Sequence, residues 1–212
     1  EIEGEKLQPD QVRSSIARRL GLDVAGLVPA DRDVEGVVEM MLDATQNYTQ
    51  PLTINRLFDW HASLFPTGRS GMTRIAVGQW RTDEKGPMQV ISGPYGKEKV
   101  HYEAPPASRI PAEMERFLDW FNNPGNTDSL LVASLAHLWF VTIHPFDDGN
   151  GRIARAIADM ALARSESSQQ RFYSMSAQVR RDPKEYYQIL ERTQKGELAI
   201  TPRPSWFLHT IA

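Results

Sequence analysis

Apolar residues recur at helical spacing along most of the chain. In residues 10–20 they lie at intervals of four and a glycine follows, which predicts a short amphipathic helix. The same spacing predicts further helices over residues 33–46, 53–64, 111–122, 129–143, 151–164 and 182–194. Asp33 is a candidate N-cap for the first of these. Residues 129–143 are apolar nearly all round, so we expect them to form the central helix.

The middle of the chain has a different pattern. Residues 68–106 are rich in Gly, Pro and Lys and contain three short β-type runs, at 75–80, 88–91 and 100–102. The sequence Gly-Pro-Tyr-Gly at 93–96 is a turn signal between two of these runs. We therefore predict a surface β-hairpin within residues 79–104, attached to an otherwise all-α bundle.

The composition is that of one globular domain with an extension. The chain has 212 residues, of which 41% are hydrophobic and 24% charged, enough for one sizeable core. A formal net charge of −3 gives no overall attraction to nucleic acid or to an anionic membrane. Without cysteine there is no thiolate nucleophile and no cysteine zinc site. The longest apolar stretch is too short to span a bilayer and no signal peptide is visible, so we expect a cytoplasmic protein.

The chemistry is concentrated between two predicted helices, in a segment that we call the motif loop. Its residues, 144–155, read His-Pro-Phe-Asp-Asp-Gly-Asn-Gly-Arg-Ile-Ala-Arg. The Gly-Asn-Gly sequence stands at a helix start, where consecutive backbone N–H groups and the helix dipole form a nest for an anion. Arg152 and Arg155 lie on the first turns of that helix, and their guanidinium groups suit phosphate oxygens. We therefore expect the motif loop to bind a phosphate-bearing ligand.

Two further side chains of the motif loop can take part in chemistry. Asp148, directly before the nest, is a hard oxygen ligand for a Mg²⁺ ion that accompanies phosphates. His144, at the end of the preceding helix, can gain or lose a proton near neutral pH. A base, a metal-binding carboxylate, a nest and two arginines together are typical of a phosphoryl or nucleotidyl transfer site. The alternative is an ordinary loop in which Asp148 pairs with Arg152 and His144 caps a helix.

The string His-Pro-Phe-x-Asp-Gly-Asn-Gly-Arg-x-x-Arg is complete in the motif loop. It resembles the signature of the Fic (filamentation induced by cyclic AMP) family of protein adenylyltransferases. The resemblance implies a Fic-type helical bundle with a β-hairpin flap, an N-terminal arm at residues 1–32 and a catalytic domain at 33–212. It also implies transfer of AMP from ATP to a Tyr, Ser or Thr hydroxyl of a target protein or of the chain itself. Gly151 matches the AMP-transferring branch, because the Doc-like branch, which phosphorylates its targets, has Lys there.

Matching positions imply a role for each residue of the motif loop. His144 would be the general base, Asp148 would hold Mg²⁺ on the α- and β-phosphates, and Phe146 would anchor the loop in the core. The arginines would neutralise the outer phosphates, and a later helix would face the adenine. The residues implied to bind the nucleotide are Gly149, Asn150, Gly151, Arg152, Arg155, Tyr187 and Gln194. The implied cofactors are ATP, as a substrate, and Mg²⁺.

One class of the family carries an inhibitory segment of the form Ser/Thr-x-x-x-Glu-Gly/Asn, whose glutamate pairs with the second motif arginine. Glu3-Gly4 matches its last two positions, so we expect Glu3 to pair with Arg155 in the space of the γ-phosphate. An exposed, frayed terminus is the alternative. Glu35-Gly36 is a rival pair, although Asp31 stands where Ser or Thr is required.

The predicted hairpin has an open edge to which a target segment can add as a strand, but a plain surface hairpin fits the sequence as well. His101 lies in this hairpin, and we expect it to face solvent. The other histidines outside the motif loop, His61, His137 and His209, lack the spacing of metal ligands, so we expect packing or surface roles.

Other functions stay open at this stage. The glycines of the motif loop fit a loose dinucleotide-binding fingerprint, but the apolar run before them ends too far away for the tight turn of that fold. A non-catalytic module that holds a nucleotide is a second alternative, and within the family the same site can remove AMP. We expect a protein partner, no nucleic acid bound by this segment and no membrane; a homodimer is a compatible assembly.

Overall fold

Helices form most of the chain, as the apolar spacing predicts. The computed structural model describes residues 7–22, 26, 28–94, 96–168 and 175–195. Its helices are α1 (Pro9–Arg19), α2 (Arg32–Gln46), α3 (Ile54–Leu64), α4 (Ile110–Asn122), α5 (Ser129–Ile143), α6 (Asn150–Glu166), α7 (Met175–Arg181) and α8 (Pro183–Lys195), with a short 3-10 helix, η1, at Ala107–Arg109. Its strands pair as two antiparallel hairpins, β1 (Arg69–Ser70) with β2 (Thr73–Arg74) and β3 (Gln89–Ser92) with β4 (Lys99–Glu103). The predicted all-α bundle with a β-hairpin is confirmed.

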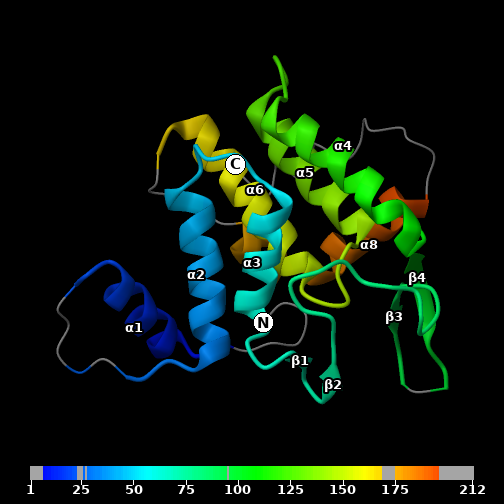
Figure 1. Cartoon of the computed structure of the whole chain (residues 1–212), viewed down its shortest axis with the longest axis horizontal. Helices are drawn as coiled ribbons and strands as arrows, with labels where there is room; N and C mark the ends of the chain where they lie inside the picture. The colour runs from blue at the N-terminus through cyan, green and yellow to red at the C-terminus, as the bar shows by residue number, and fades with distance from the viewer. Residues whose placement is uncertain (1–6, 23–25, 27, 95, 169–174, 196–212) are drawn as a thin grey trace.

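The centre of the bundle is the pair α5 and α6, with α2 and α3 packed on one side and α4 beside α5 (Figure 1). Asp128 begins α5, because its carboxylate accepts the backbone N–H groups of Leu130 and Leu131 at 2.9 and 3.2 Å. Large apolar side chains such as Phe140 and Ile153 are fully buried, and each contributes about 1.5–3 kcal/mol to stability. This core fixes where α5 ends and α6 begins, and the motif loop joins these two ends. Within the described residues, the helices are too short or too polar to cross a bilayer.

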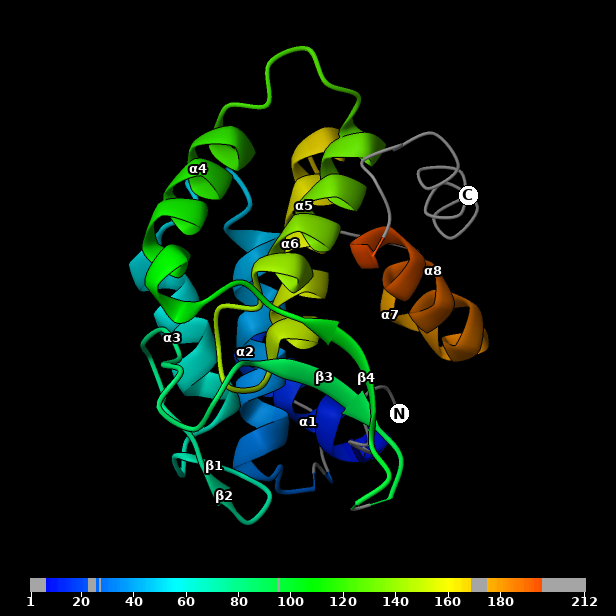
Figure 2. The same cartoon turned by 90° about the vertical axis from the view of Figure 1, so that its right-hand side faces the viewer.

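Two hairpins lie beside this junction (Figure 2). The β3–β4 hairpin, which we call the flap, lies across the ends of α5 and α6 and contacts α8 through β4. Its strands are shorter than the 79–104 range expected from the sequence, and its register shifts between Val90 and Ile91. The β1–β2 hairpin lies on the other side of the motif loop. It was not predicted, because two-residue strands leave no periodic signal.

The predicted start of α2 was wrong. The helix begins at Arg32, so Asp33 lies in its first turn and Asp31 is the N-cap. Asp31 does not bond its own helix through its side chain; its carboxylate accepts Gln11 Nε2 at 3.1 Å. The cap residue is therefore used to attach α1 to α2.

The predicted strand at 75–80 was also wrong. The backbone N–H of Ala76 donates to Asp147 Oδ2 at 2.9 Å, and that of Gly78 donates to His61 Nδ1 at 3.2 Å. The apolar residues of this segment still pack against the core. Because its backbone donors bind side chains instead of another strand, the segment lines the motif loop as an irregular stretch.

Candidate functional site

The motif loop begins at His144, which has a left-handed backbone conformation with φ 51° and ψ 59°. This conformation costs a residue with a Cβ atom roughly 1–2 kcal/mol. The backbone N–H of His144 closes the last turn of α5 on Phe140 O at 3.0 Å, and its ring Nδ1 lies 3.1 Å from the carbonyl oxygen of Val141. A carbonyl can only accept, so the ring proton is on Nδ1 and Nε2 carries the lone pair. In the neutral imidazole, Nε2 is thus the nitrogen that can accept a proton.

Asp148 is held by its neighbours but remains partly open to solvent. Its Oδ1 accepts the N–H of Gly149 at 2.6 Å, its Oδ2 accepts the hydroxyl of Ser70, and 44% of its side chain is exposed. Among the described residues no group of three or more acidic or histidine side chains could form a metal cage. A single exposed carboxylate suits Mg²⁺, which binds proteins through one or two carboxylates and takes its other ligands from water and phosphates.

Gly149 is the N-cap of α6 and requires glycine for two reasons. Its φ is +80°, and a Cβ atom there would lie 2.9 Å from the ring of Phe65. The first backbone hydrogen bond of α6 runs from the N–H of Ile153 to the carbonyl of Gly149, at 3.0 Å. The N–H groups of Asn150 and Gly151 therefore precede the ladder, at the positive end of the helix dipole.

Asn150 closes the motif loop internally. Its Oδ1 accepts the N–H of Phe146 at 3.0 Å and its Nδ2 donates to the carbonyl of Phe146 at 2.8 Å. Phe146 is fully buried and stacks on the ring of His61 at 4.2 Å, so its expected role as a core anchor is confirmed. The Asn150 side chain is itself buried, which leaves its backbone N–H as the group suited to an anion.

The two arginines of the motif loop lie at different depths. Arg152 lies over the ring of Phe65 at 4.8 Å, and its guanidinium is 4.0 Å from Asp148 Oδ2. Arg155 is buried, on the same helix face as the buried Asp159 one turn later. Burial and the charge of Arg155 together lower the pKa of His137 to about 3.

The two residues predicted on the adenine side belong to α8. Tyr187 is 44% exposed, whereas its neighbour Tyr186 is buried with its hydroxyl 3.2 Å from His137 Nε2. Gln194 Nε2 donates to the carbonyl of Val141 at 3.4 Å. This carbonyl also accepts His144 Nδ1, so the end of α8 reaches the turn that carries the predicted base.

Residues that the sequence did not single out also shape the site. His61 fits the expected packing role, since it is fully buried; in addition, its ring bridges the N–H of Gly78 and the carbonyl of Asp148, each at 3.2 Å. Burial lowers its pKa to about 4, so it is neutral near pH 7. Arg81 is buried and donates to the carbonyl of His144 at 2.7 Å. His61 lies at helical spacing from Leu57 and Leu64, which indicates burial but not its hydrogen-bond partners. Arg81 belongs to no periodic or motif pattern, so the sequence held no signal for its contacts.

His101 was expected to face solvent, and this was wrong. It lies on β4 with Nδ1 2.9 Å from Glu191 Oε2 of α8 and Nε2 2.6 Å from the hydroxyl of Ser92. Lys99 lies 3.6 Å from the same glutamate. The flap is therefore attached to α8 by charged groups.

The predicted inhibitory residue Glu3 lies outside the described residues, as does His209. The rival pair Glu35-Gly36 has a packing explanation. A Cβ atom on Gly36 would lie 1.8 Å from the carbonyl oxygen of Ser63, so glycine allows α2 and α3 to approach closely. Glu35 is paired with Arg18 of α1 at 3.5 Å.

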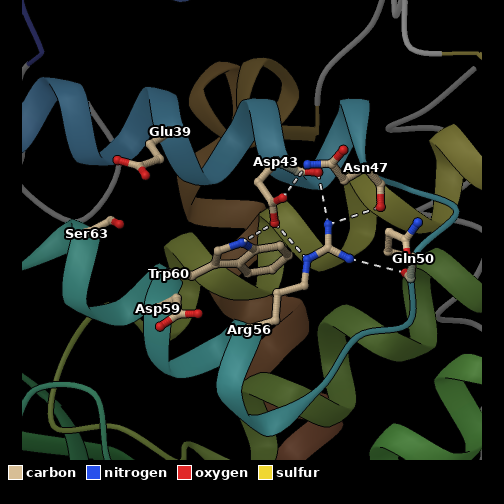
Figure 3. A pocket seen from close by; sticks show the side chains of 8 residues that line it. All are labelled: Glu39, Asp43, Asn47, Gln50, Arg56, Asp59, Trp60 and Ser63. Atoms are coloured by element: carbon tan, nitrogen blue, oxygen red, sulfur yellow. Dashed lines mark hydrogen bonds and ion pairs between the residues drawn. The ribbon is translucent and has the colours of Figure 1, made fainter.

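A cavity of about 390 Å³ lies between α2 and α3 (Figure 3). Its lining residues are Glu39, Asp43, Asn47, Gln50, Arg56, Asp59, Trp60 and Ser63. Asp43 accepts Arg56 Nε and Trp60 Nε1, each at 2.7 Å, and Figure 3 shows these groups turned toward one another. Burial raises the pKa of Asp43, but hydrogen bonds from Asn47, Arg56 and Trp60 outweigh it and leave this pKa below its usual value. The cavity contains none of the predicted site residues, and its polar groups stabilise the contact between the two helices.

Comparison with known proteins gives two family matches. The model described as "Fic/DOC family" matches residues 51–162, more than half of the chain, and a domain of unknown function (DUF4172) matches residues 1–22. The chain is 33% identical over 87 residues to the protein adenylyltransferase Fic of Drosophila willistoni. It is 31% identical over 121 residues to the uridine 5'-monophosphate transferase of Xanthomonas campestris pv. campestris (strain 8004). The aligned parts are 40% and 54% of this chain but only 16% and 21% of those relatives.

Solved structures show the same fold. A Fic family protein from Desulfovibrio desulfuricans G20 has a TM-score of 0.68 at 24% identity, covering 97% of this chain and 57% of that one. A Fic domain containing signaling protein from Bacteroides thetaiotaomicron VPI-5482 has a TM-score of 0.63 at 23% identity, covering 99% of this chain and 74% of that one.

Proposed function

Because the chain belongs to the Fic/DOC family, we propose that it is a nucleotidyltransferase that moves AMP from ATP to a hydroxyl of a protein side chain. The observation that carries this proposal is the orientation of His144. Its Nδ1–H is bound to the carbonyl of Val141, so Nε2 is the basic atom, and one short loop joins the residue to a helix start suited to phosphates.

In this reaction His144 Nε2 takes the proton of the target hydroxyl while the hydroxyl oxygen bonds to the α-phosphorus of ATP. The bond from that phosphorus to the oxygen bridging to the β-phosphate breaks, and pyrophosphate leaves. The N–H groups of Asn150 and Gly151 would hold the α- and β-phosphates, and Arg152 and Arg155 would neutralise the outer ones. These donors are fixed before the nucleotide binds, which reduces the reorganisation needed in the transition state.

Asp148 would hold Mg²⁺ together with phosphate oxygens. Its partial exposure, and the lack of a group of three or more acidic or histidine ligands among the described residues, suit an ion that arrives with the nucleotide. When bound, Mg²⁺ supplies positive charge that offsets the charge of the triphosphate. Tyr187, exposed on α8, and Gln194 would lie on the side of the base.

We also propose that Glu3 inhibits the enzyme by pairing with Arg155. The support is the sequence and the charge: Glu3-Gly4 fits the end of the inhibitory pattern, and a carboxylate can form paired hydrogen bonds with a guanidinium. Glu1 and Glu5 stand two residues away on either side, so they provide matched controls for charge and position.

Intact-mass measurement after incubation with Mg²⁺ and ATP tests both proposals. We expect a gain of one AMP per modified hydroxyl, faster in Glu3→Gly than in the parent chain or in Glu5→Gly, and absent in His144→Ala. Calorimetry should show that His144→Ala still binds ATP, because this residue contacts the reacting atoms and not the phosphate nest. Labelling that persists without His144 would exclude it as the base, and equal rates in Glu3→Gly and Glu5→Gly would exclude the inhibitory role.

The same intact-mass measurement distinguishes three alternatives: transfer from another nucleotide, the reverse reaction and a non-catalytic module. A parallel reaction with UTP tests base choice, since one relative is named a uridine 5'-monophosphate transferase, and we expect ATP to be preferred. Loss of AMP from a pre-labelled chain would indicate the reverse reaction. Binding of ATP with no covalent product on itself or on proteins of a cell extract, even in Glu3→Gly, would indicate a non-catalytic module.

A further inference from the structure

Arg81 is a buried cation that contacts the backbone of the motif loop at two successive residues. Its side chain is fully inaccessible to solvent, and its Nε donates to the carbonyl of His144 at 2.7 Å. Its own backbone N–H donates to the carbonyl of Pro145 at 3.0 Å. A hydrogen bond from a charged donor is about twice as strong as a neutral one, which applies to the bond from Nε. The two bonds together hold the peptide groups on both sides of Pro145.

The contact is made at the strained residue of the loop. His144 is one of two residues other than glycine, among those described, that have a positive φ. In this conformation its carbonyl points toward Arg81 while its ring points back to Val141, so a rotation of the backbone that breaks one contact also disturbs the other. The position of Nε2 therefore depends on the Arg81 contact.

The remaining donors of Arg81 bind the segments that precede and follow the flap. Nη1 donates at 2.8 Å to Oδ1 of Asp83, in the segment that leads into β3, and Nη2 donates at 2.6 Å to the carbonyl of Pro105, in the segment after β4. The other oxygen of Asp83 accepts the N–H of Ala107 at 2.6 Å. One planar guanidinium thus joins the two segments that flank the flap and the residue that carries the base.

We propose that Arg81 is a positioning residue that fixes the imidazole of His144 and sets its distance from the flap. The inference rests on the proposed function, because it assumes that His144 is the base. A target segment bound at the flap would then lie at a fixed distance from the imidazole of His144, because the guanidinium of Arg81 holds the residue that carries this base. Loss of this attachment would misplace the base by a fraction of an ångström to an ångström, which lowers turnover about tenfold to a hundredfold.

The chain provides a matched control in Arg164. This arginine is half-buried and donates to backbone carbonyls, those of Tyr48 at 2.7 Å and Gln50 at 2.9 Å in the loop after α2 and that of Phe121 at 3.2 Å in the last turn of α4. It lies at the opposite end of α6 from the motif loop. Replacing it removes the same kind of contact from the fold without touching His144.

The experiment compares Arg81→Lys, Arg81→Met and Arg164→Lys in the full chain. Lysine keeps the charge but cannot serve all three side-chain acceptors of Arg81 with a planar fork. We expect Arg81→Lys to lower kcat about tenfold or more with KM for Mg-ATP within twofold of the parent, and Arg164→Lys to leave both values near the parent. The readout independent of activity is long-range ¹H–¹⁵N NMR of the histidine rings, with His144 assigned by its loss in His144→Ala. Arg81→Lys should shift or broaden the His144 signals away from the Nδ1–H pattern, and Arg164→Lys should not.

Each outcome decides the proposal. Unchanged His144 signals or a kcat within twofold of the parent in Arg81→Lys would overturn it. So would unfolding of both Arg81 variants under conditions in which Arg164→Lys stays folded, because Arg81 would then serve the fold as a whole. If neither the parent chain nor Glu3→Gly transfers AMP, the proposed function fails, but the NMR comparison still reports whether Arg81 positions the ring.

Discussion

His144 and Gly149 both have left-handed backbone conformations, with φ 51° and 80°, and they stand at the two ends of the turn between α5 and α6. At Gly149 the conformation is free of steric cost, because glycine has no Cβ atom. At His144 the cost is offset by hydrogen bonds to its N–H, its carbonyl and its ring. The residue proposed to do the chemistry is thus also the one whose geometry depends most on its neighbours.

A Gly149→Ala substitution should separate backbone strain from steric clash. The introduced alanine would have to adopt a left-handed conformation and place its methyl group against Phe65, so we expect a loss of about 2–4 kcal/mol in the free energy of unfolding. Gly125→Ala is the control, since Gly125 has φ +61° and open space around it and should lose only about 1 kcal/mol. Urea denaturation measures both. Equal losses would contradict the predicted clash, and Phe65→Leu should recover part of the stability in the Gly149→Ala background.

The identities of the motif residues could be read from the sequence, because each residue type suits one chemical task. The residues that hold these side chains in place could not be read from the sequence. Arg81 binds backbone carbonyls and His61 bridges a backbone N–H and a carbonyl, and such partners depend on how distant segments fold together. Asn150 shows the same limit: the motif predicted it at the site, but not that its amide would close the loop on Phe146.

At the scale of elements, the end of α5 joins the flap and α8. A helix leaves its last four carbonyls without partners in its own ladder. Here Val141 O accepts Gln194 of α8, Thr142 O accepts the hydroxyl of Tyr102 on β4 at 2.8 Å, and His144 O accepts Arg81. Burial raises the pKa of Tyr102 to about 12, so its hydroxyl remains a donor near neutral pH. Any shift of the flap or of α8 therefore acts on the turn that carries His144.

The helices were predictable because each has an apolar face at helical spacing, while pairing between short segments was not. Residues 75–80 show why: the run predicted a strand, and its apolar side chains do pack against the core, but the N–H groups of Ala76 and Gly78 bind Asp147 and His61 instead of a strand. Residue type indicates which side chains pack inside, whereas the partners of the backbone depend on the tertiary fold.

We predict that the buried histidine at the contact between α5 and α8 makes the free energy of unfolding depend on pH. His137 of α5 is fully buried beside Tyr186 of α8, and burial together with Arg155 lowers its pKa to about 3, against about 6.5 in the unfolded chain. Between these two values the unfolded chain binds more protons, so stability should fall as the pH is lowered from 6.5 toward 3, by about 1.4 kcal/mol per pH unit from this group. His137→Leu should remove that part of the slope between pH 4 and 6.

Urea denaturation at a series of pH values measures this slope. Tyr186→Phe is the control, because it removes the hydroxyl partner and keeps the buried imidazole, so the slope should be retained. A slope in His137→Leu as steep as that of the parent chain would show that His137 is accessible to protons in the folded state.

At the scale of the whole molecule, arginines connect loops that are far apart in the sequence. Arg56 joins Asp43 to carbonyls that follow α2, and Arg81 joins the segments that flank the flap to the motif loop. Arg164 joins the end of α6 to the loop after α2 and to the last turn of α4. Burial, with a smaller effect from Arg56, lowers the pKa of Arg164 to about 10, which leaves it charged near neutral pH. The helices form the core, but these guanidinium groups fix the irregular segments between them, including the one that carries the proposed chemistry.

The last prediction concerns the response of the whole fold to its ligand. A ligand that binds only the folded chain stabilises it by about 2.7 kcal/mol at a concentration one hundred times its Kd, which for a chain of this size raises Tm by about 5–10 °C. We expect Mg-ATP to produce such a shift and EDTA to remove most of it, because in the proposed binding mode Asp148 would contribute one carboxylate and the remaining ligands would come from the phosphates and water. Asp148→Asn, of nearly equal volume, should lose the dependence on Mg²⁺ and keep a smaller shift with ATP alone, whereas Glu39→Gln in the cavity between α2 and α3 should behave as the parent chain. Differential scanning calorimetry with ATP, Mg-ATP and NAD measures these shifts. A shift with NAD that exceeds the shift with Mg-ATP, or a full response to Mg²⁺ in Asp148→Asn, would contradict the proposed binding mode.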